Sequence, residues 1–268
     1  MASFSVVSNI ASASAQANLS GTNLGLNKAL TRLSSGYRIN TAGDDAAGLA
    51  LANANRNKVM VLDQGVRNAN DGLSQLQIKD GALNNISSLL DRLATLATQG
   101  ASAAGGIDIS KLSSEFNTLT SEIDREAAVA GMTASASFSV FVSAESTVGN
   151  GAVSGTIGAV EVADLGITQL TFTSVAQAQT ALSQVQAAIS SLGTVQGTIG
   201  TLQNRLQFAI SLAQSQQVNT KAAESRIRDA NIAEESANMT RYNILTQSGI
   251  AALAQANQTS SSVLALLR

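Results

Sequence analysis

Residues 30–50 read Leu30-Thr-Arg-Leu-Ser-Ser-Gly-Tyr-Arg-Ile-Asn-Thr-Ala-Gly-Asp-Asp-Ala-Ala-Gly-Leu-Ala50 and contain signals for the end of one helix and the start of the next. Helices commonly end at a glycine in the left-handed conformation, so we expect a first helix to stop at Gly36. Thr41, followed three residues later by Asp44, fits a capping box with Asp in place of Glu. The stretch therefore predicts two successive helices joined by a short turn.

Outward from this stretch, both ends of the chain lack charge. Residues 1–27 and 242–267 carry no charged side chain, although 13% of the whole chain is charged. A solvated helix normally has a charged outer face, so these ends do not resemble ordinary surface helices. Frayed polar tails are the alternative, but the ends hold many aliphatic side chains: Val6, Val7, Ile10, Leu19, Leu24, Leu26, Leu30, Leu33, Ile244, Leu245, Ile250, Leu253, Val263, Leu264, Leu266 and Leu267.

The spacing of these residues predicts that the two ends are helices that pair. Leu26, Leu30 and Leu33 step by four and three residues. Steps of four and three, typical of a coiled-coil seam, also occur at Tyr242, Thr246, Gly249, Leu253, Ala256, Ser260, Val263 and Leu267. Small residues in this seam would let two helices approach closely. We expect an antiparallel or otherwise paired unit that is apolar on more than one face.

Two further seams predict long helical rods between the ends. The first follows Val59, Leu62, Val66, Ala69, Leu73, Leu76, Asp80, Leu83, Ile86, Leu90, Leu93 and Ala97. The second follows Leu182, Val185, Ile189, Leu192, Gln196, Ile199, Leu202, Leu206, Ala209 and Ala213. Each seam contains one irregular three-and-three step, at residues 80–86 and 196–202, and such a step is a stammer in the heptad. The matching stammers favour rods that lie side by side.

The segment between the rods changes character. A shorter amphipathic helix is expected from Leu112, Phe116, Leu119 and Ile123, ending before Gly131. Residues 132–175 then show strand signals separated by glycine turns, at Phe138/Val140/Val142, Val160/Val162 and Leu170/Phe172. This segment is rich in Ser, Thr and Gly, so we expect a small β insertion at the surface.

The residue types exclude most kinds of catalytic and binding site. The chain has no Cys and no His, which removes thiol chemistry, the Ser-His-Asp triad and the commonest metal ligand. Asp44-Asp45 stands at a helix start, where carboxylates neutralise the helix dipole, and Glu234-Glu235 lacks further ligands for a transition metal. With a net charge of −2 there is no nucleic-acid footprint. We therefore expect no catalytic residue, metal, cofactor, nucleic acid or membrane span.

Specific motifs identify a family resemblance. Residues 30–50 closely resemble the signature of bacterial flagellin. The C-terminal half of that family is similar to Leu202-Gln-Asn-Arg-Leu206, Ser225-Arg-Ile-Arg-Asp-Ala-Asn-Ile-Ala-Glu234, Ile244-Leu-Thr-Gln247, Leu253-Ala-Gln-Ala-Asn-Gln258 and Val263-Leu-Ala-Leu-Leu-Arg268. The resemblance covers roughly residues 1–130 and 180–268. Two departures are Thr259 or Ser260 where the family often has proline, and Asn231 where it often has Asp.

The resemblance implies a mainly α protein: a long antiparallel helical or coiled-coil bundle formed by both chain ends, with a small insertion rich in β-hairpin. It implies filament-core helices, disordered in the monomer, at residues 1–40 and 232–268. It also implies an outer-tube helical domain at residues 41–131 and 176–231, and a variable surface insertion at residues 132–175. The implied function is a structural subunit that polymerises into the bacterial flagellar filament for swimming. The chain would be secreted unfolded by the flagellar type III apparatus, without signal cleavage.

The implied partners are other copies of the chain and the flagellar export chaperone, cap and junction proteins. We predict subunit contacts through Leu26, Leu30, Leu33, Leu245, Leu253, Val263 and Leu267. In many flagellins an Arg, a Leu and a Glu contact the flagellin-sensing Toll-like receptor, and the matching positions are Arg92, Leu96 and Glu115. Subunit packing alone is the other role for these three residues. A hook–filament junction protein is the closest alternative function, followed by a secreted coiled-coil adhesin and, last, an enzyme.

Overall fold

The computed structural model describes residues 9–102, 108–143 and 151–266, with the side chains of 259–266 left aside. The chain forms two compact units. We call residues 1–57 with 220–268 the terminal unit, and residues 58–219 the central unit. The boundaries between them fall inside two long helices, α2 (Ala46–Ala101) and α5 (Val175–Arg228). The assignment of these parts to filament layers stays a prediction.

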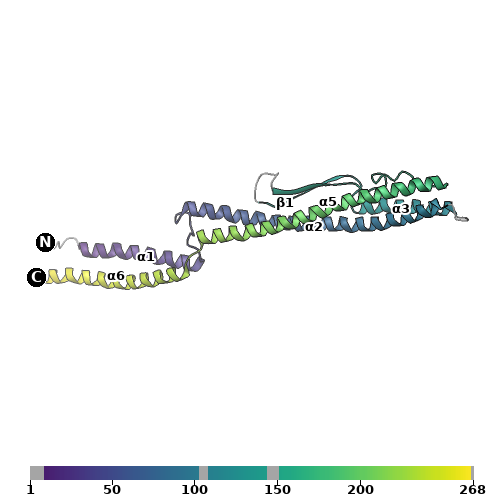
Figure 1. Cartoon of the computed structure of the whole chain (residues 1–268). Coiled ribbons are helices and arrows are strands. Elements are labelled where there is room, and N and C mark those ends of the chain that lie inside the picture. Colours follow the sequence, from purple (N-terminus) through teal and green to yellow (C-terminus); the bar gives the residue numbers. More distant parts are fainter. Residues whose placement is uncertain (1–8, 103–107, 144–150, 267–268) are drawn as a thin grey trace. The chain divides into compact units, whose positions relative to one another are not determined.

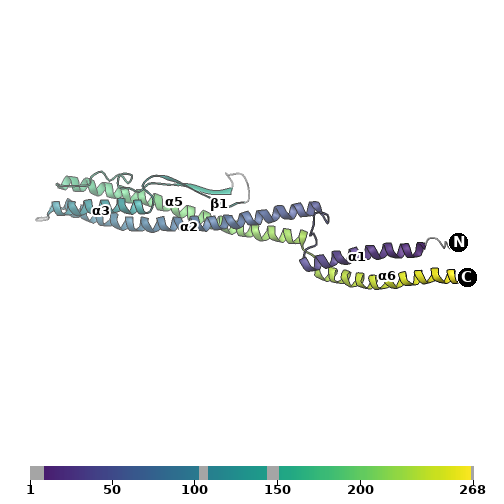
Figure 2. The ribbon, with the colours of Figure 1, turned by 180° about the vertical axis from the view of Figure 1, so that it is seen from behind.

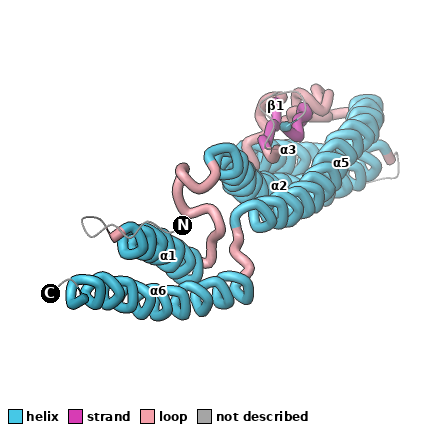
Figure 3. Tube along the Cα trace, turned by 90° about the vertical axis from the view of Figure 1, so that its left-hand side faces the viewer, coloured by secondary structure: helices cyan, strands magenta, loops and turns pink. Residues whose placement is uncertain are grey.

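The terminal unit contains a pair of helices from opposite ends of the sequence (Figures 1 and 3). Helix α1 (Ile10–Ser35) ends at Gly36, which has φ 74° and donates its amide N–H to the Arg32 carbonyl. The expected helix end is therefore confirmed. Helix α6 (Ile232–Leu266) lies beside α1. Its first amides, at Ala233 and Glu234, donate to the Asn231 side chain.

The expected capping box at Thr41 is wrong in position. Helix α2 begins at Ala46, where the Asp45 carboxylate accepts the Gly48 amide at 2.8 Å and satisfies a free N–H of the first turn. Residues 41–44 form a turn before the helix. Within it, the Asp44 carboxylate accepts the Thr41 amide at 3.1 Å. The Thr-to-Asp contact of a capping box is thus present, but it closes a turn.

The central unit is built on α2, α3 (Ile109–Val129) and α5. The predicted seams lie inside: among the fully buried side chains are Leu62, Leu76, Leu83, Leu90, Leu93, Phe116, Ile123, Val185, Leu192, Ile199 and Leu206. Helices α2 and α5 run antiparallel, because Gly72 lies next to Leu206 while Gly100 lies next to Ala178. The side-chain amide of Gln196 donates to the Asn84 side-chain oxygen Oδ1 at 3.4 Å. The two stammers therefore face each other, as their matching irregularity predicts.

A two-stranded antiparallel hairpin lies over the helices of the central unit (Figure 2). Strand β1 (Ala136–Phe141) pairs with β2 (Ala152–Ile157), with Phe138 opposite Gly155. Phe138 and Val140 turn inward and Phe141 outward, which confirms the predicted alternation. Glycines let the hairpin lie close to α2: a Cβ at Gly65 would clash with the Val142 carbonyl oxygen. A Cβ at Gly72 would meet the Val140 side chain at 2.7 Å.

The other expected strands are wrong, although three of their four apolar residues are buried; the fourth, Leu170, is 41% exposed. Val160, Val162 and Phe172 are at most 4% exposed, yet none lies in a strand. Their backbone amides bond to other parts of the unit instead of a neighbouring strand. The amide of Val162 donates to the Asp124 carboxylate at 2.8 Å, and that of Phe172 donates to the Ser113 hydroxyl at 3.0 Å. One face of the insertion is thus part of the core.

Candidate assembly surface

The contact between α1 and α6 has a regular antiparallel register. The Asn9 side chain donates to the Ala256 carbonyl at 3.0 Å near one end, and Arg32 pairs with Glu235 at 2.9 Å near the other. The predicted C-terminal seam is confirmed, because its members in the described region are half-buried while their neighbours are exposed: Tyr242, Thr246, Gly249, Leu253 and Ala256. The seam on α1 runs through Ser12, Ala15, Leu19, Thr22, Leu26, Ala29 and Leu33.

Glycines set the closest approach of the two helices. A Cβ at Gly25 would lie 2.6 Å from the Tyr242 ring, so that ring rests directly against the α1 backbone. A Cβ at Gly249 would lie 3.2 Å from the Leu19 side chain. Each helix thus supplies one large residue and one glycine. This reciprocal pairing favours one register, because sliding either helix along the other would place large residues against each other.

The surfaces of α1 and α6 that face away from the seam carry exposed aliphatic side chains among polar residues, and they hold no charge in residues 9–27 and 242–266. Leu24 is 70% exposed on α1, and Ile244 is 58% exposed on α6. Each lies two positions from seam residues on both sides, and at about 100° per residue this places it on the back of its helix. Further exposed aliphatic side chains on these helices are Ile10, Leu30, Leu245 and Ile250. We call these six residues the outer aliphatic set.

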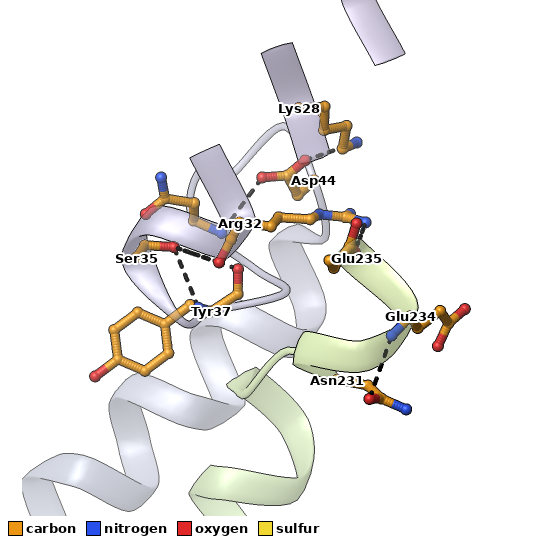
Figure 4. Close-up of polar contacts among 9 residues, drawn as sticks. Lys28, Arg32, Ser35, Tyr37, Asp44, Asn231, Glu234 and Glu235 are labelled. Atoms are coloured by element: carbon orange, nitrogen blue, oxygen red, sulfur yellow. Dashed lines mark hydrogen bonds and ion pairs between the residues drawn. The ribbon is translucent and has the colours of Figure 1, made fainter. Parts of the chain in front are cut away.

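Charged residues gather where the helix pair meets its connecting segments (Figure 4). Lys28 pairs with Asp44 at 2.7 Å, and Arg32 pairs with the buried Glu235. The Lys28 ammonium, helped by the Thr41 and Asn40 amides, holds the pKa of Asp44 well below its usual range. Burial of Glu235 is tolerable because it has a cationic partner. The ion pairs therefore lie at the base of the helix pair, while residues 9–27 of α1 and its N-cap and residues 242–266 of α6 carry no charge.

Backbone contacts join the two connecting segments of the terminal unit. Tyr37 and Asp229 form an antiparallel β-bridge, and the Ala230 amide donates to the Gly36 carbonyl at 2.9 Å. The Arg228 guanidinium lies over the Tyr37 ring, 4.2 Å from its centroid. The end of α1 and the start of α6 are thus fixed to each other independently of the seam.

The predicted interface residues fall into three groups. Leu26, Leu33 and Leu253 are half-buried in the α1–α6 seam. Leu30, at 44% exposed, and Leu245, at 45%, lie outside the seam, so the predicted seam position of Leu30 is wrong. The side chains of Val263 and Leu267 lie outside the described residues. The prediction omitted four exposed residues: Ile10, Leu24, Ile244 and Ile250. Their signal in the sequence is a large aliphatic side chain close to the seam but outside it. Ile250 lies one position from a seam residue, and the other three lie two positions away.

The three residues predicted to contact a receptor are not all on the surface. Arg92 and Glu115 are exposed and pair with each other, with the guanidinium 2.6 Å from the carboxylate. Leu96 is only 1% exposed and belongs to the core of the central unit, so the prediction of a surface contact through its side chain is wrong for this structure. The Arg92–Glu115 pair links α2 to α3 within the chain, and the alternative role of these positions in subunit packing stays a prediction.

The described residues offer little for small-molecule chemistry. Within them, no three His, Cys, Asp or Glu side chains gather as a metal site would require. Of the helices in the described part, none is both long and apolar enough to cross a membrane. The Lys79 ammonium, whose pKa burial lowers, donates to the carbonyls of Ala130 and Gly131 at the end of α3. That contact caps a helix C-terminus.

Comparisons with known proteins agree with this arrangement. Residues 6–134 match the bacterial flagellin N-terminal helical region, and residues 182–267 match the C-terminal helical region. A flagellin of Halalkalibacterium halodurans is 35% identical, covering 92% of this chain and 95% of that protein. A flagellar filament 33 kDa core protein of Treponema phagedenis is 33% identical, covering 97% and 98%.

A solved structure was also matched. The crystal structure of Bacillus cereus flagellin is 28% identical, with a TM-score of 0.46 over 59% of this chain and 94% of that one. The assignment rests on the sequences, since both family regions and nearly the full length of each relative are matched. The chain belongs to the bacterial flagellin family.

Proposed function

We propose that this chain is the structural subunit that polymerises into the bacterial flagellar filament, and that the outer aliphatic set on α1 and α6 makes contacts between copies. The observation that carries this proposal is the set of large aliphatic side chains exposed on the uncharged parts of both terminal helices. Leu24 and Ile244 point away from the partner helix and are mostly exposed. Residues 1–27 and 242–267 hold no charge that would have to be buried unpaired.

The energetics favour association of such faces. Burying a Leu or Ile side chain contributes about 1.5–3 kcal/mol. Burial of even part of the six-residue outer aliphatic set would therefore contribute substantially to the free energy of association. Each copy then presents faces on two different helices to different neighbours. A contact between unlike faces that does not close into a ring generates a helical filament.

The comparisons support the filament subunit over the alternatives. The relatives described above are named flagellin or filament core protein, and nothing found favours a hook–filament junction protein. The flagellin family is a family of structural proteins, which accords with a non-enzymatic role. Secretion by the flagellar export apparatus, and contacts with its chaperone, cap and junction proteins, are further proposals that follow from family membership.

Charge substitutions on the outer aliphatic set test the assembly role. We expect Leu24→Asp or Ile244→Asp to abolish filaments, because assembly would bury an unpaired carboxylate. Salt-precipitated protein would be examined by electron microscopy for tubes of constant diameter. Ser139→Asp, on the exposed face of β1, is the matched control and should assemble normally. Normal tubes from both helix variants would contradict the proposed surface.

Receptor recognition is a separate proposal that the burial of Leu96 narrows to Arg92 and Glu115. The receptor would contact these two exposed residues together, as an ion pair between α2 and α3. Purified monomer should activate a reporter cell that carries the flagellin-sensing receptor, and Arg92→Ala with Glu115→Ala should reduce the response. An inactive parent monomer would end this proposal without affecting filament assembly.

A further inference from the structure

Helix α5 has an outer face that differs from those of the other helices of the central unit. Between Val175 and Asn219 its only charged residue is Arg205, which donates to the Ser154 carbonyl at 2.9 Å. By contrast, the much shorter α3 carries charges at Lys111, Glu115, Glu122, Asp124, Arg125 and Glu126. Since a solvated helix normally has a charged outer face, α5 shows the same neutral character as α1 and α6.

Large apolar side chains project from this neutral face. Phe208 is 76% exposed and Leu212 is 60% exposed. The core-facing row of α5 includes Ile199, Leu206 and Ala213, all buried. Phe208 lies two positions after Leu206, which at about 100° per residue puts it on the opposite side of the helix. It is not needed to cover the core of its own chain.

The same face carries glycines that nothing in the chain requires. Gly193, Gly197 and Gly200 follow one another at four and three residues, and four-residue steps lead on from Gly200 to Phe208. A Cβ added at any of the three glycines would meet no atom within 4 Å. Glycine in a helix interior is destabilising relative to alanine, so the fold of this chain gains nothing from them. Beneath the hairpin, by contrast, a Cβ at Gly65 or Gly72 would clash with a neighbour.

We propose that the outer face of α5 is a second contact surface between copies of this chain, where Phe208 of one copy packs against the glycine row of another. This inference rests on the proposed filament function and adds a surface in the central unit. A helix face without side chains beyond Cα lets another element approach closely, and an exposed aromatic ring is the shape that fills such a depression. The absence of charge on the face means that the contact leaves no unpaired ion.

A second copy is the occupant that these features fit. The projecting residue and the depression lie on one face of one helix, offset along its axis, so a shifted copy can satisfy both. Such a contact joins different parts of the same surface and can be repeated from copy to copy. A polar or charged partner would not match a face whose only charge is already bonded to the hairpin.

Two matched pairs of variants test the surface in the full-length chain. Gly197→Leu fills the glycine row, and its control Gly81→Leu fills an equally open glycine on the charged helix α2. Phe208→Ser removes the projecting ring, and its control Ile78→Ser removes a side chain that is 68% exposed on α2. The critical concentration for filament growth from sheared seeds is measured by sedimentation, and the helix content of each variant by circular dichroism.

We expect both α5 variants to raise the critical concentration at least tenfold while the two α2 controls stay within twofold of the parent. All four should keep the parent's helix content, because none of the changed side chains contacts the core. Growth of both α5 variants at the parent's critical concentration would overturn the proposal, as would an equal rise in the α2 controls. A parent chain that forms no filament would instead refute the proposed function, and the two failures are therefore distinguishable.

Discussion

Single glycines have opposite roles at different positions of this chain, and the neighbouring atoms decide which role applies. Gly25 is required because the Tyr242 ring occupies the place of its missing side chain. Gly21 lies one turn earlier on α1, and a Cβ there would meet nothing within 4 Å. The two residues have the same helical environment and differ in whether the partner helix passes over them. They form a natural test of how tightly α1 and α6 pair.

We predict that Gly25→Ala destabilises the terminal helix pair by about 1–3 kcal/mol, the usual effect of overpacking. Gly21→Ala should instead stabilise α1 by about 0.5–1 kcal/mol, because alanine loses less conformational freedom in a helix. Amide hydrogen exchange across residues 10–35 of filaments would measure both changes. Equal protection in the two variants would show that Tyr242 does not lie against Gly25.

At the scale of elements, the carboxylate of Asp44 couples α1 to the turn that precedes α2. It accepts the Thr41 amide and pairs with Lys28, and the ammonium lowers the pKa of the carboxyl group. A carboxyl group whose pKa is lower when folded stabilises the fold above its unfolded pKa, which is about 4. That contribution is lost as the pH falls through the lower pKa of the folded state. The connection between the helices should therefore weaken in acid.

We predict that Asp44→Asn lowers the melting temperature of the full-length chain at pH 7. The difference in melting temperature between Asp44→Asn and the parent should shrink steadily as the pH falls below 4. A protonated Asp side chain is neutral, as Asn is, so neither can then pair with Lys28 as a charge. Thermal melting followed by circular dichroism between pH 2.5 and pH 7 measures this directly. Asp71→Asn on the exposed side of α2, where no ion pair is recorded for the carboxylate, serves as control. A constant gap between parent and Asp44→Asn at all pH values would contradict the role given to the ion pair.

Periodicity predicted the elements well and the outward faces less well. Every described residue of the seam predicted on α6 is confirmed, because residues that step by four and three lie on one side of a helix. The shorter run at Leu26, Leu30 and Leu33 fitted a seam, but Ala29, at 2% exposed, occupies the contact position. A small buried residue gives no hydrophobic signal that distinguishes it from a surface alanine. Likewise, the amides of Val162 and Phe172 bond to Asp124 and Ser113, long-range partners that alternation cannot reveal.

In the whole molecule, the two units differ in the size of their hydrophobic cores. The hydrophobic cluster of the central unit runs from Leu62 to Ala213 and draws on α2, α3, α5 and the hairpin. In the described part of the terminal unit, the buried residues are Ala29, Ile39, Ala52 and Glu235. Two paired helices with so little buried surface are marginally stable, because most helical stability in proteins comes from packing. The terminal unit therefore depends on contacts that the single chain does not supply.

This difference predicts how the chain responds to loss of its ends. Removing residues 1–27 or 242–268 takes away most of one side of the α1–α6 seam and leaves the cluster from Leu62 to Ala213 intact. The truncated chains should remain helical and melt cooperatively, since their principal core is unchanged. They should form no filaments at any concentration, because the outer aliphatic set is incomplete. Circular dichroism and electron microscopy of the same samples measure both outcomes. Tubes from either truncated chain would place the essential subunit contacts in the central unit alone, where the α5 face would have to supply them.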